Sequence, residues 1–310
     1  MNAFGILVEQ IEFFVIYMVI GVILIKTKIL TQTTIEVIAR FVLKLALPLL
    51  IFTNTINGVE RETLFGTLSV LGLAVFIYFL AYFLLFGMSK VFRLEGNVGS
   101  VYRALGMFGN VGFMGIPIIS SIFPENGMLY ISLFTIIDQM VLWTLGVKLT
   151  TPCESDGGKF NPKKLINPAT VAISLAVLFI LSGISLPNVF NVALSKIGAT
   201  ATPLAMIYLG GVFACMDIRK YVGKVEFYGI VLIKMVLFPI LVFEGFGLLP
   251  ISQEICMTMA LLTAMPAMSS IVMMAKTSGS EGDYAVGGIS ITTICSVITL
   301  PVICWILQKL

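Results

Sequence analysis

The residues of this chain that could take part in chemistry are few, and two of them lie deep inside long apolar runs. Asn110 stands among glycines in the run Ala104-Leu-Gly-Met-Phe-Gly-Asn-Val-Gly-Phe-Met-Gly-Ile-Pro117. Its amide can both donate and accept hydrogen bonds to a ligand. Asp138 lies near the middle of another run, beside Gln139 and close to Thr135. An ionisable group at membrane depth is by default a functional candidate.

The run around Asn110 is poorly suited to one continuous helix. Pro117 lacks an amide donor and its ring clashes with the preceding turn, and each glycine costs about 1 kcal/mol relative to alanine. Inside a bilayer, a broken helix must satisfy its freed backbone groups through protein, water or a ligand. Glycines alone could equally mark a close helix-packing face. Together with Asn110 and Pro117, they favour a broken helix at a transport site.

Composition indicates a membrane protein. Of the 310 residues, 58% are hydrophobic and 11% are charged, whereas soluble domains are about one-quarter charged. The absence of histidine excludes histidine-based nucleophile systems and histidine zinc sites. The 5 cysteines form no CxxC pair, and the 16 acidic residues are dispersed. We therefore expect no enzyme and no resident metal or cofactor, with Na⁺ or H⁺ left open as a coupling ion. The scattered basic residues and net charge of +3 predict no nucleic-acid partner.

Apolar runs of about 20 residues predict ten transmembrane helices. The predicted spans are 6–25, 36–56, 64–88, 101–122, 128–148, 165–183, 193–214, 225–248, 253–275 and 284–307. The connections after odd-numbered spans, together with the adjoining span ends, hold 13 Lys and Arg residues, against 3 on the opposite side. By the positive-inside rule, a multi-pass protein of the cytoplasmic (inner) membrane is expected, with both termini extracytoplasmic.

Two short matches predict an internal repeat. Leu-Ala-Leu-Pro48 resembles Thr-Ala-Thr-Pro203, and Pro124-Glu125 resembles Ser280-Glu281, at offsets of 155 and 156 residues. The expected halves are residues 1–149 and 165–310, joined by a cytoplasmic linker at 150–164. Because each half has five spans, the halves would be inverted relative to each other. The offset places Asn110 opposite Met265 and Pro266, so spans four and nine both carry a helix-breaking feature near their middle.

The motif Gly109-Asn110-Val-Gly112-Phe-Met-Gly115-Ile-Pro117 resembles the fourth-helix motif of the auxin efflux carrier (PIN-like) family, which includes bacterial malonate- and malate-type permeases. Other segments fit the same pattern: Asn167-Pro168, Ala201-Thr-Pro-Leu204, Pro266-Ala267 and Thr299-Leu-Pro301. The resemblance implies an all-α membrane protein of ten helices in two inverted five-helix repeats. It also implies a scaffold unit, a transport unit, broken helices four and nine that cross, and elevator-type alternating access.

The site expected from these arguments has a substrate part and a coupling part. The substrate-binding residues are expected to be Asn110, Gly109, Gly112, Pro117, Asn54, Met265, Pro266 and Ala267, and the coupling-ion or proton residues Asp138, Gln139 and Thr135. Asn54 is included because the same region of the second helix faces the substrate in the family. Open alternatives are a helix-capping role for Asn110, an interfacial position for Asn54, and an ion pair of Asp138 with Lys44 or Lys234. Both lysines could instead snorkel to an interface.

The function expected is secondary transport of small organic anions, such as mono- or dicarboxylates. A sodium-coupled symporter of larger amphipathic anions is the nearest alternative. A non-transporting metabolite sensor or an intramembrane enzyme would belong to another class. The expected partners are a small carboxylate and the lipid bilayer, and a homodimer is left open.

Overall fold

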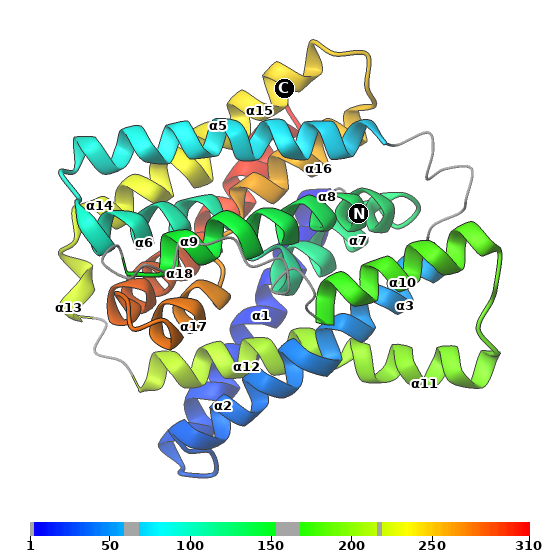
Figure 1. The fold of residues 1–310 in the computed structure, drawn as a ribbon, viewed down its shortest axis with the longest axis horizontal. Helices are drawn as coiled ribbons and strands as arrows, with labels where there is room; N and C mark the ends of the chain where they lie inside the picture. The colour runs from blue at the N-terminus through cyan, green and yellow to red at the C-terminus, as the bar shows by residue number, and fades with distance from the viewer. Residues whose placement is uncertain (1–2, 59–67, 153–167, 216–218) are drawn as a thin grey trace. The chain divides into compact units, whose positions relative to one another are not determined.

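The computed structural model describes residues 3–58, 68–152, 168–215 and 219–310, and these are almost entirely helical. Figure 1 shows helices throughout the described chain, and a single antiparallel bridge joins Gly109 and Ala267 within it. The expectation of an all-α membrane protein is therefore confirmed. Most of the predicted linker 150–164 and Asn167 lie outside the described residues.

Six described helical stretches are long and apolar enough to cross a membrane. They are Phe4–Lys26, Ser69–Val91, Gly127–Thr150, Asn188–Ala214, Val225–Gly247 and Gly282–Leu307. Two other predicted spans, 101–122 and 253–275, are each divided into shorter helices, as expected from their Gly, Asn and Pro residues.

The chain forms two compact units, each drawn from both halves of the sequence. Unit 1 comprises Met1–Ser69, Gly112–Ile136 and Ile166–Asp217. Its helices are α1 (Ala3–Lys26), α2 (Gln32–Phe41), α3 (Leu47–Gly58), α7 (Ile116–Ile122), the first part of α8 (Gly127–Val141), α10 (Pro168–Ser182), α11 (Asn188–Ala199) and α12 (Ala201–Ala214). Within it, α1 and α12 touch backbone to backbone, because a Cβ on Gly21 would meet the carbonyl of Ile207. Small residues permit this close approach in membranes.

Unit 2 comprises Val70–Val111, Ile137–Leu165 and Ile218–Leu310. Its helices are α5 (Ser69–Val91), α6 (Gly96–Met107), the end of α8, α9 (Val147–Thr150), α13 (Arg219–Val222), α14 (Val225–Gly229), α15 (Phe238–Gly247), α16 (Gln253–Ala264), α17 (Ser270–Thr277) and α18 (Gly282–Leu307). The compact units are a different division from the predicted repeat halves 1–149 and 165–310, which stay a prediction from the sequence.

Helix α5 shows how the sequence fixes the direction of its side chains. Buried residues recur every three or four positions: Val70, Leu73, Ala74, Ile77, Tyr78, Ala81, Leu85 and Met88. The opposite face is equally apolar but exposed, with Phe79 at 57% and Phe83 at 55%. A helix that is hydrophobic all round is typical of a membrane span. The single polar side chain on the buried face near its centre is Tyr78, which is thereby directed into unit 2.

Four described segments are wound as π-helix: η1 (Val42–Ala46), η2 (Val111–Gly115), η3 (Leu142–Gly146) and η5 (Ile230–Leu237). Such turns are rare and are frequently found at functional sites, because the wider turn shifts the direction of the following side chains. Segment η2 begins directly after Asn110, η3 follows Asp138 by four residues, and η5 contains Lys234. Asn110 and Lys234 thus lie next to or within an irregular turn, and Asp138 lies about one turn before another.

Candidate substrate and coupling site

Two broken helices pair with each other at their breaks, inside unit 2. Helix α6 ends at Met107 and α16 ends at Ala264. The backbone N–H of Asn110 donates to the carbonyl of Pro266 at 2.7 Å, and the N–H of Met268 donates to the carbonyl of Phe108 at 2.9 Å. This short antiparallel pairing satisfies backbone groups that a broken membrane helix would otherwise leave unpaired. It brings together the predicted residues Gly109, Asn110, Met265, Pro266 and Ala267.

Helix α18 supports the second break from behind. The N–H of Ala267 donates to the hydroxyl oxygen of Thr292 at 3.2 Å, and that hydroxyl in turn donates to the carbonyl of Gly288 at 2.8 Å. Thr292 is fully buried. The threonine therefore supplies the partner that the interrupted helix cannot supply for Ala267.

The side chain of Asn110 is buried with an unused acceptor at the antiparallel pairing of residues 108–110 with 265–268, which is called the crossing below. Asn110 is 1% exposed, and its Oδ1 accepts no hydrogen bond from any described residue. A helix-capping side chain would use this oxygen to accept from a backbone N–H. Capping therefore does not account for Asn110. Leaving a buried acceptor unpaired costs about 1–3 kcal/mol. The side-chain amide of Asn110 is therefore available for a hydrogen bond with a ligand.

Lys234 is buried beside the crossing, and sequence reasoning missed its position. It is 3% exposed, and its Nζ donates a hydrogen bond to the carbonyl of Met265. A Cβ placed on Gly109 would lie 3.4 Å from this nitrogen. The snorkelling interpretation of Lys234 is therefore wrong. The ammonium group instead stabilises the carbonyl end of α16, where the helix dipole is negative.

A position count on the sequence argues against snorkelling at Lys234. Lys234 is nine residues from the start of the span Val225–Gly247, or about 14 Å along a helix. That is further than a lysine side chain can reach, so the count argues against snorkelling but does not say which group the ammonium contacts.

Asp138 is at the centre of a buried hydrogen-bond chain. It is fully buried, and the hydroxyl of Tyr78 donates to its Oδ1. The amide of Gln139 donates to its Oδ2 at 3.0 Å, and the indole N–H of Trp143 donates to the Oε1 of Gln139 at 3.2 Å. Lys234 acts on Asp138 electrostatically, but no direct ion pair joins Asp138 to a lysine in the described part of the chain.

The other predicted site residues are placed differently. Thr135 is buried, but its hydroxyl donates to the carbonyl of Ile131 in the same helix at 2.6 Å. Gly112 faces Leu47, and Pro117 lies in the first turn of α7, where a missing amide is tolerated. Asn54 is half-buried in α3. These four residues belong to unit 1, whereas the break itself falls at residues 108–110. The expectation that Pro117 is part of the break is thus wrong in position.

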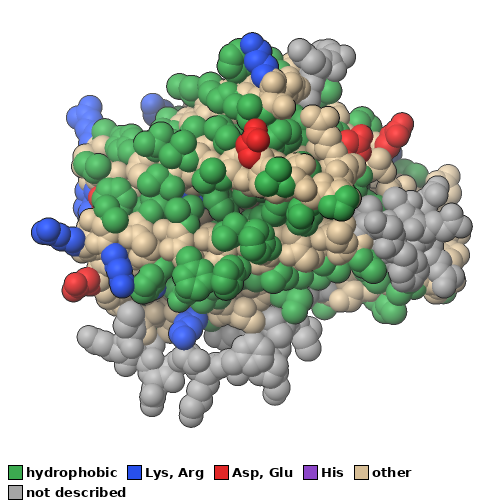
Figure 2. Space-filling view, turned by 90° about the horizontal axis from the view of Figure 1, so that it is seen from above, with side chains coloured by type: hydrophobic (Ala, Val, Ile, Leu, Met, Phe, Trp, Pro, Cys, Tyr) green, Lys and Arg blue, Asp and Glu red, His purple; other side chains and the backbone are tan. Residues whose placement is uncertain are grey.

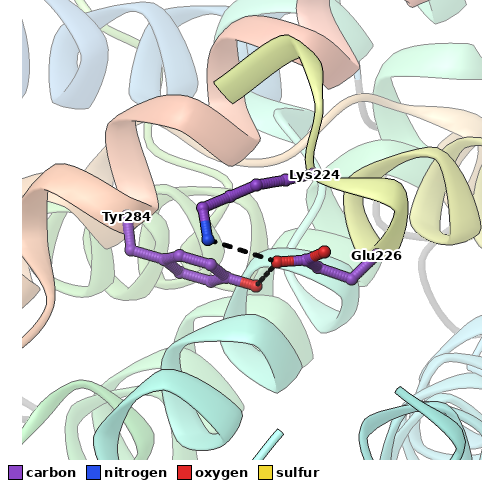
Figure 3. A network of polar contacts seen from close by, with 3 residues as sticks. All are labelled: Lys224, Glu226 and Tyr284. Atoms are coloured by element: carbon purple, nitrogen blue, oxygen red, sulfur yellow. Dashed lines mark hydrogen bonds and ion pairs between the residues drawn. The ribbon is translucent and has the colours of Figure 1, made fainter. Parts of the chain in front are cut away.

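A second polar cluster ties α14 to the start of α18 (Figure 3). The ammonium of Lys224 lies 3.7 Å from the carboxylate of Glu226, and the hydroxyl of Tyr284 donates to the same carboxylate oxygen at 3.3 Å. Tyr102 is fully buried and close enough to Glu226 to be affected by its charge. The hydroxyl of Tyr102 has no hydrogen-bond partner among the described residues. The cluster holds α18, and with it Thr292, in register with the rest of unit 2.

An apolar groove of about 750 Å³ lies between α5 and the η5–α15 stretch. Its walls are apolar throughout, and include Phe76, Leu237 and Phe246. A carboxylate needs hydrogen-bond donors or a positive charge to replace its hydration. We therefore assign the candidate site to the crossing, where such groups exist.

Comparison with known families agrees with the geometry. The model of the family described as "membrane transport protein" matches residues 6–161 and 155–304, so it spans nearly the whole chain. No curated protein matches the chain significantly. The two matched segments meet inside the predicted linker region. The chain therefore belongs to the membrane transport protein family, the family of the auxin efflux carriers that its Gly-Asn motif resembles.

Proposed function

We propose that this protein is a secondary active transporter of small organic anions, with the crossing of α6 and α16 as the substrate site. One observation carries the proposal: the buried amide of Asn110 is not held by a hydrogen bond to its Oδ1 from any described residue, so it is free to turn its N–H₂ toward an anion, and the adjacent Gly109 lies against the ammonium of Lys234. The amide can turn to present either its N–H₂ or its oxygen. A carboxylate would thus meet both a hydrogen-bond donor and a positive field in a dry site, where both are strong.

The proposed architecture is the one that the family resemblance implies. Ten helices in two inverted repeats would cross the inner membrane, with both termini outside. Unit 2 contains the crossing and would be the transport unit, and unit 1 would be the scaffold. Elevator-type alternating access would then carry the crossing from one side of the membrane to the other. Gly112, Pro117 and Asn54, which belong to unit 1, stay predictions from the family resemblance for substrate binding.

For coupling, we propose that Lys234 takes the place of a coupling cation. Its ammonium donates a hydrogen bond to the carbonyl of Met265. A backbone carbonyl of this kind is the ligand that Na⁺ would use at a broken helix. Asp138, held by Tyr78 and Gln139, would then be the proton-carrying group. The proposal predicts anion transport that depends on a proton gradient and proceeds equally in Na⁺ and in K⁺.

The test begins with a panel of mono- and dicarboxylates. Each is tested for thermal stabilisation of the purified protein, and any that stabilise are tested for counterflow in liposomes. Asn110→Ala should weaken binding of the active anion about 10-fold or more, as expected for a hydrogen bond to a charged group. The matched control is Asn188→Ala, which makes the same change at an exposed position in α11 and should leave binding unchanged.

Three results would contradict the proposal in different ways. Unchanged binding and transport in Asn110→Ala would move the substrate site elsewhere. Transport that stops when Na⁺ is replaced by K⁺ would favour the sodium symporter. Binding without counterflow in the unaltered protein would indicate a sensor.

A further inference from the structure

A stripe of exposed aromatic side chains follows one face of α5 and ends at two cations. Phe79, Phe83 and Phe86 are 57%, 55% and 37% exposed, and Lys90 continues the same face by one further turn. Their spacing of three or four residues keeps them on one side of the helix. The face belongs to a predicted membrane span, so its apolar part lies at the depth of lipid chains.

The aromatic rings pack along the helix as a continuous surface. Phe79 and Phe83 are in edge contact with ring centroids 4.8 Å apart, and Tyr82 stacks on Phe86 at 6.3 Å. From Phe79 to Lys90 is eleven residues, or roughly 16 Å along a helix, close to half of the ~30 Å hydrocarbon core. The stripe therefore has about the length of one lipid leaflet.

Two cations flank the last ring of the stripe. The ammonium of Lys90 lies 4.7 Å from the centroid of Phe86, and the guanidinium of Arg103, from α6, lies 5.6 Å from it. Arg103 is held in place by hydrogen bonds to the carbonyl of Gly99 at 3.1 Å and to the hydroxyl of Ser100 at 3.0 Å. Neither cation forms an ion pair with a described residue. Two positive charges, of which that of Arg103 is held in place, thus lie beside one ring without an ion-pair partner among the described residues.

The wider surface has the same pattern. Figure 2 shows one face of the chain, with hydrophobic side chains over its middle and several Lys and Arg side chains at its left edge. An anionic headgroup beside basic residues, with its chains on apolar helix faces, is the arrangement in which membrane proteins bind anionic lipids.

We infer that Lys90 and Arg103 bind the headgroup of an anionic phospholipid, whose acyl chain lies along Phe86, Phe83 and Phe79. Charge complementarity selects this occupant, because a second copy of the chain would have to supply an acidic group at this point, whereas an anionic lipid brings its phosphate with it. Planar guanidinium groups are well suited to phosphate oxygens. The inference concerns the lipid-facing surface of unit 2 and stands independently of which anion is transported.

The test compares phosphatidylglycerol with phosphatidylcholine of the same acyl chains, added to the full-length protein in neutral detergent. Bound lipid is counted by native mass spectrometry, and the midpoint of thermal unfolding is followed in parallel. Phosphatidylglycerol should bind and stabilise the protein more than phosphatidylcholine does. Each basic residue near a membrane surface contributes about 1 kcal/mol to such binding, so Lys90→Gln with Arg103→Gln should weaken phosphatidylglycerol binding roughly 10- to 30-fold.

Lys26→Gln with Lys28→Gln is the matched control, because it removes two exposed charges from unit 1 and should leave the lipid preference intact. Lys90→Glu alone provides a second variant at an exposed position, should the loss of Arg103 unfold the protein. Equal binding of the two lipids by the unaltered protein would overturn the inference. So would an undiminished preference in the variants, or equal stabilisation by inorganic phosphate alone. A change of oligomeric state in Lys90→Glu without a change in lipid preference would assign the stripe to a second copy of the chain.

Discussion

The two helix breaks of unit 2 pair with each other but are built from different residues. The first, at residues 108–110, contains Gly109 and Asn110, and the second, at 265–269, contains Pro266. In the first, a buried side-chain oxygen has no partner in the described chain. In the second, the Met265 carbonyl accepts from Lys234 and the Ala267 N–H donates to Thr292. One break is left open, whereas the other is closed by side chains from neighbouring helices.

This asymmetry assigns different tasks to the two breaks. Closed polar groups define one backbone geometry, because breaking either bond would leave a buried group unpaired. An unpaired polar group can instead form a hydrogen bond with a ligand, and this bond contributes to the free energy of binding. We therefore expect substitutions around the second break to destabilise the protein, and substitutions at Asn110 to change ligand binding with a smaller effect on stability.

The largest effect is expected from Lys234→Met, which keeps an unbranched side chain one atom shorter and removes its charge. The carbonyl of Met265 would lose its donor, and Asp138 would lose the nearest compensating charge. We expect a loss of roughly 3 kcal/mol in stability and loss of transport. The measurement is the midpoint of thermal unfolding of the purified protein, together with counterflow.

Lys44→Met is the control for this prediction, because Lys44 also lies in a π-helical turn within an apolar run but is exposed. It should unfold like the unaltered protein. Adding Asp138→Asn to Lys234→Met should recover part of the lost stability, since the double variant has no buried carboxylate without a counter-charge. A double variant that is as unstable as the sum of the two single variants would show that the two residues do not interact.

A smaller effect is expected from Gly109→Ala, which tests how tightly the two breaks are packed. The new Cβ would lie 3.1 Å from the Cβ of Met265 and 3.4 Å from the ammonium of Lys234. The breaks would have to separate slightly, at a cost of about 2 kcal/mol. At Gly112, the new Cβ would lie 3.5 Å from the side chain of Leu47, which is ordinary contact. Gly112→Ala should therefore unfold at the same temperature as the unaltered protein, or higher.

The sequence was informative about the breaks because their cause is local. Pro266 and the glycines around Asn110 disfavour helix wherever they stand, so spans four and nine could be expected to break, and the repeat offset paired them. Pro117 was misplaced because a proline is tolerated in the first turn of a helix, and the start of α7 depends on the break seven residues earlier. Local propensity therefore located the break to within one or two turns.

The polar partners could not be predicted in the same way, because they come from helices far apart in the sequence. Whether Lys234 faces lipid or the crossing depends on the rotation of its helix, and the apolar run gives no hydrophobic face from which to read it. The π-helical turn η5 changes that rotation further. The contacts of Tyr78 with Asp138 and of Thr292 with Ala267 span 60 and 25 residues. Only the packing of unit 2 makes them neighbours.

Tyr78→Phe is expected to have the next effect, about 1 kcal/mol, because it removes the hydrogen bond that the Tyr78 hydroxyl donates to Asp138 and leaves that from Gln139. Transport should shift in its pH dependence, while binding of the anion at the crossing changes less. Tyr82→Phe removes a hydroxyl from the next turn of α5, where the ring packs against Phe83 and Phe86. If both variants behaved alike, the hydroxyl of Tyr78 would have no special role in holding Asp138.

The smallest effect, on the order of 0.5–1 kcal/mol, is expected from Trp143→Phe, since a neutral hydrogen bond at the end of the chain contributes least. Trp143 donates to Gln139, which donates to Asp138, so its loss frees the amide of Gln139 without exposing the carboxylate. The fluorescence of the Trp143 indole also reports on this end of the hydrogen-bond chain. In a Trp305→Phe background, Trp143 is the only tryptophan, and its fluorescence should respond to a proton gradient but not to the transported anion at constant pH. A response to the anion alone would mean that the open break and the Asp138 chain form one site rather than two.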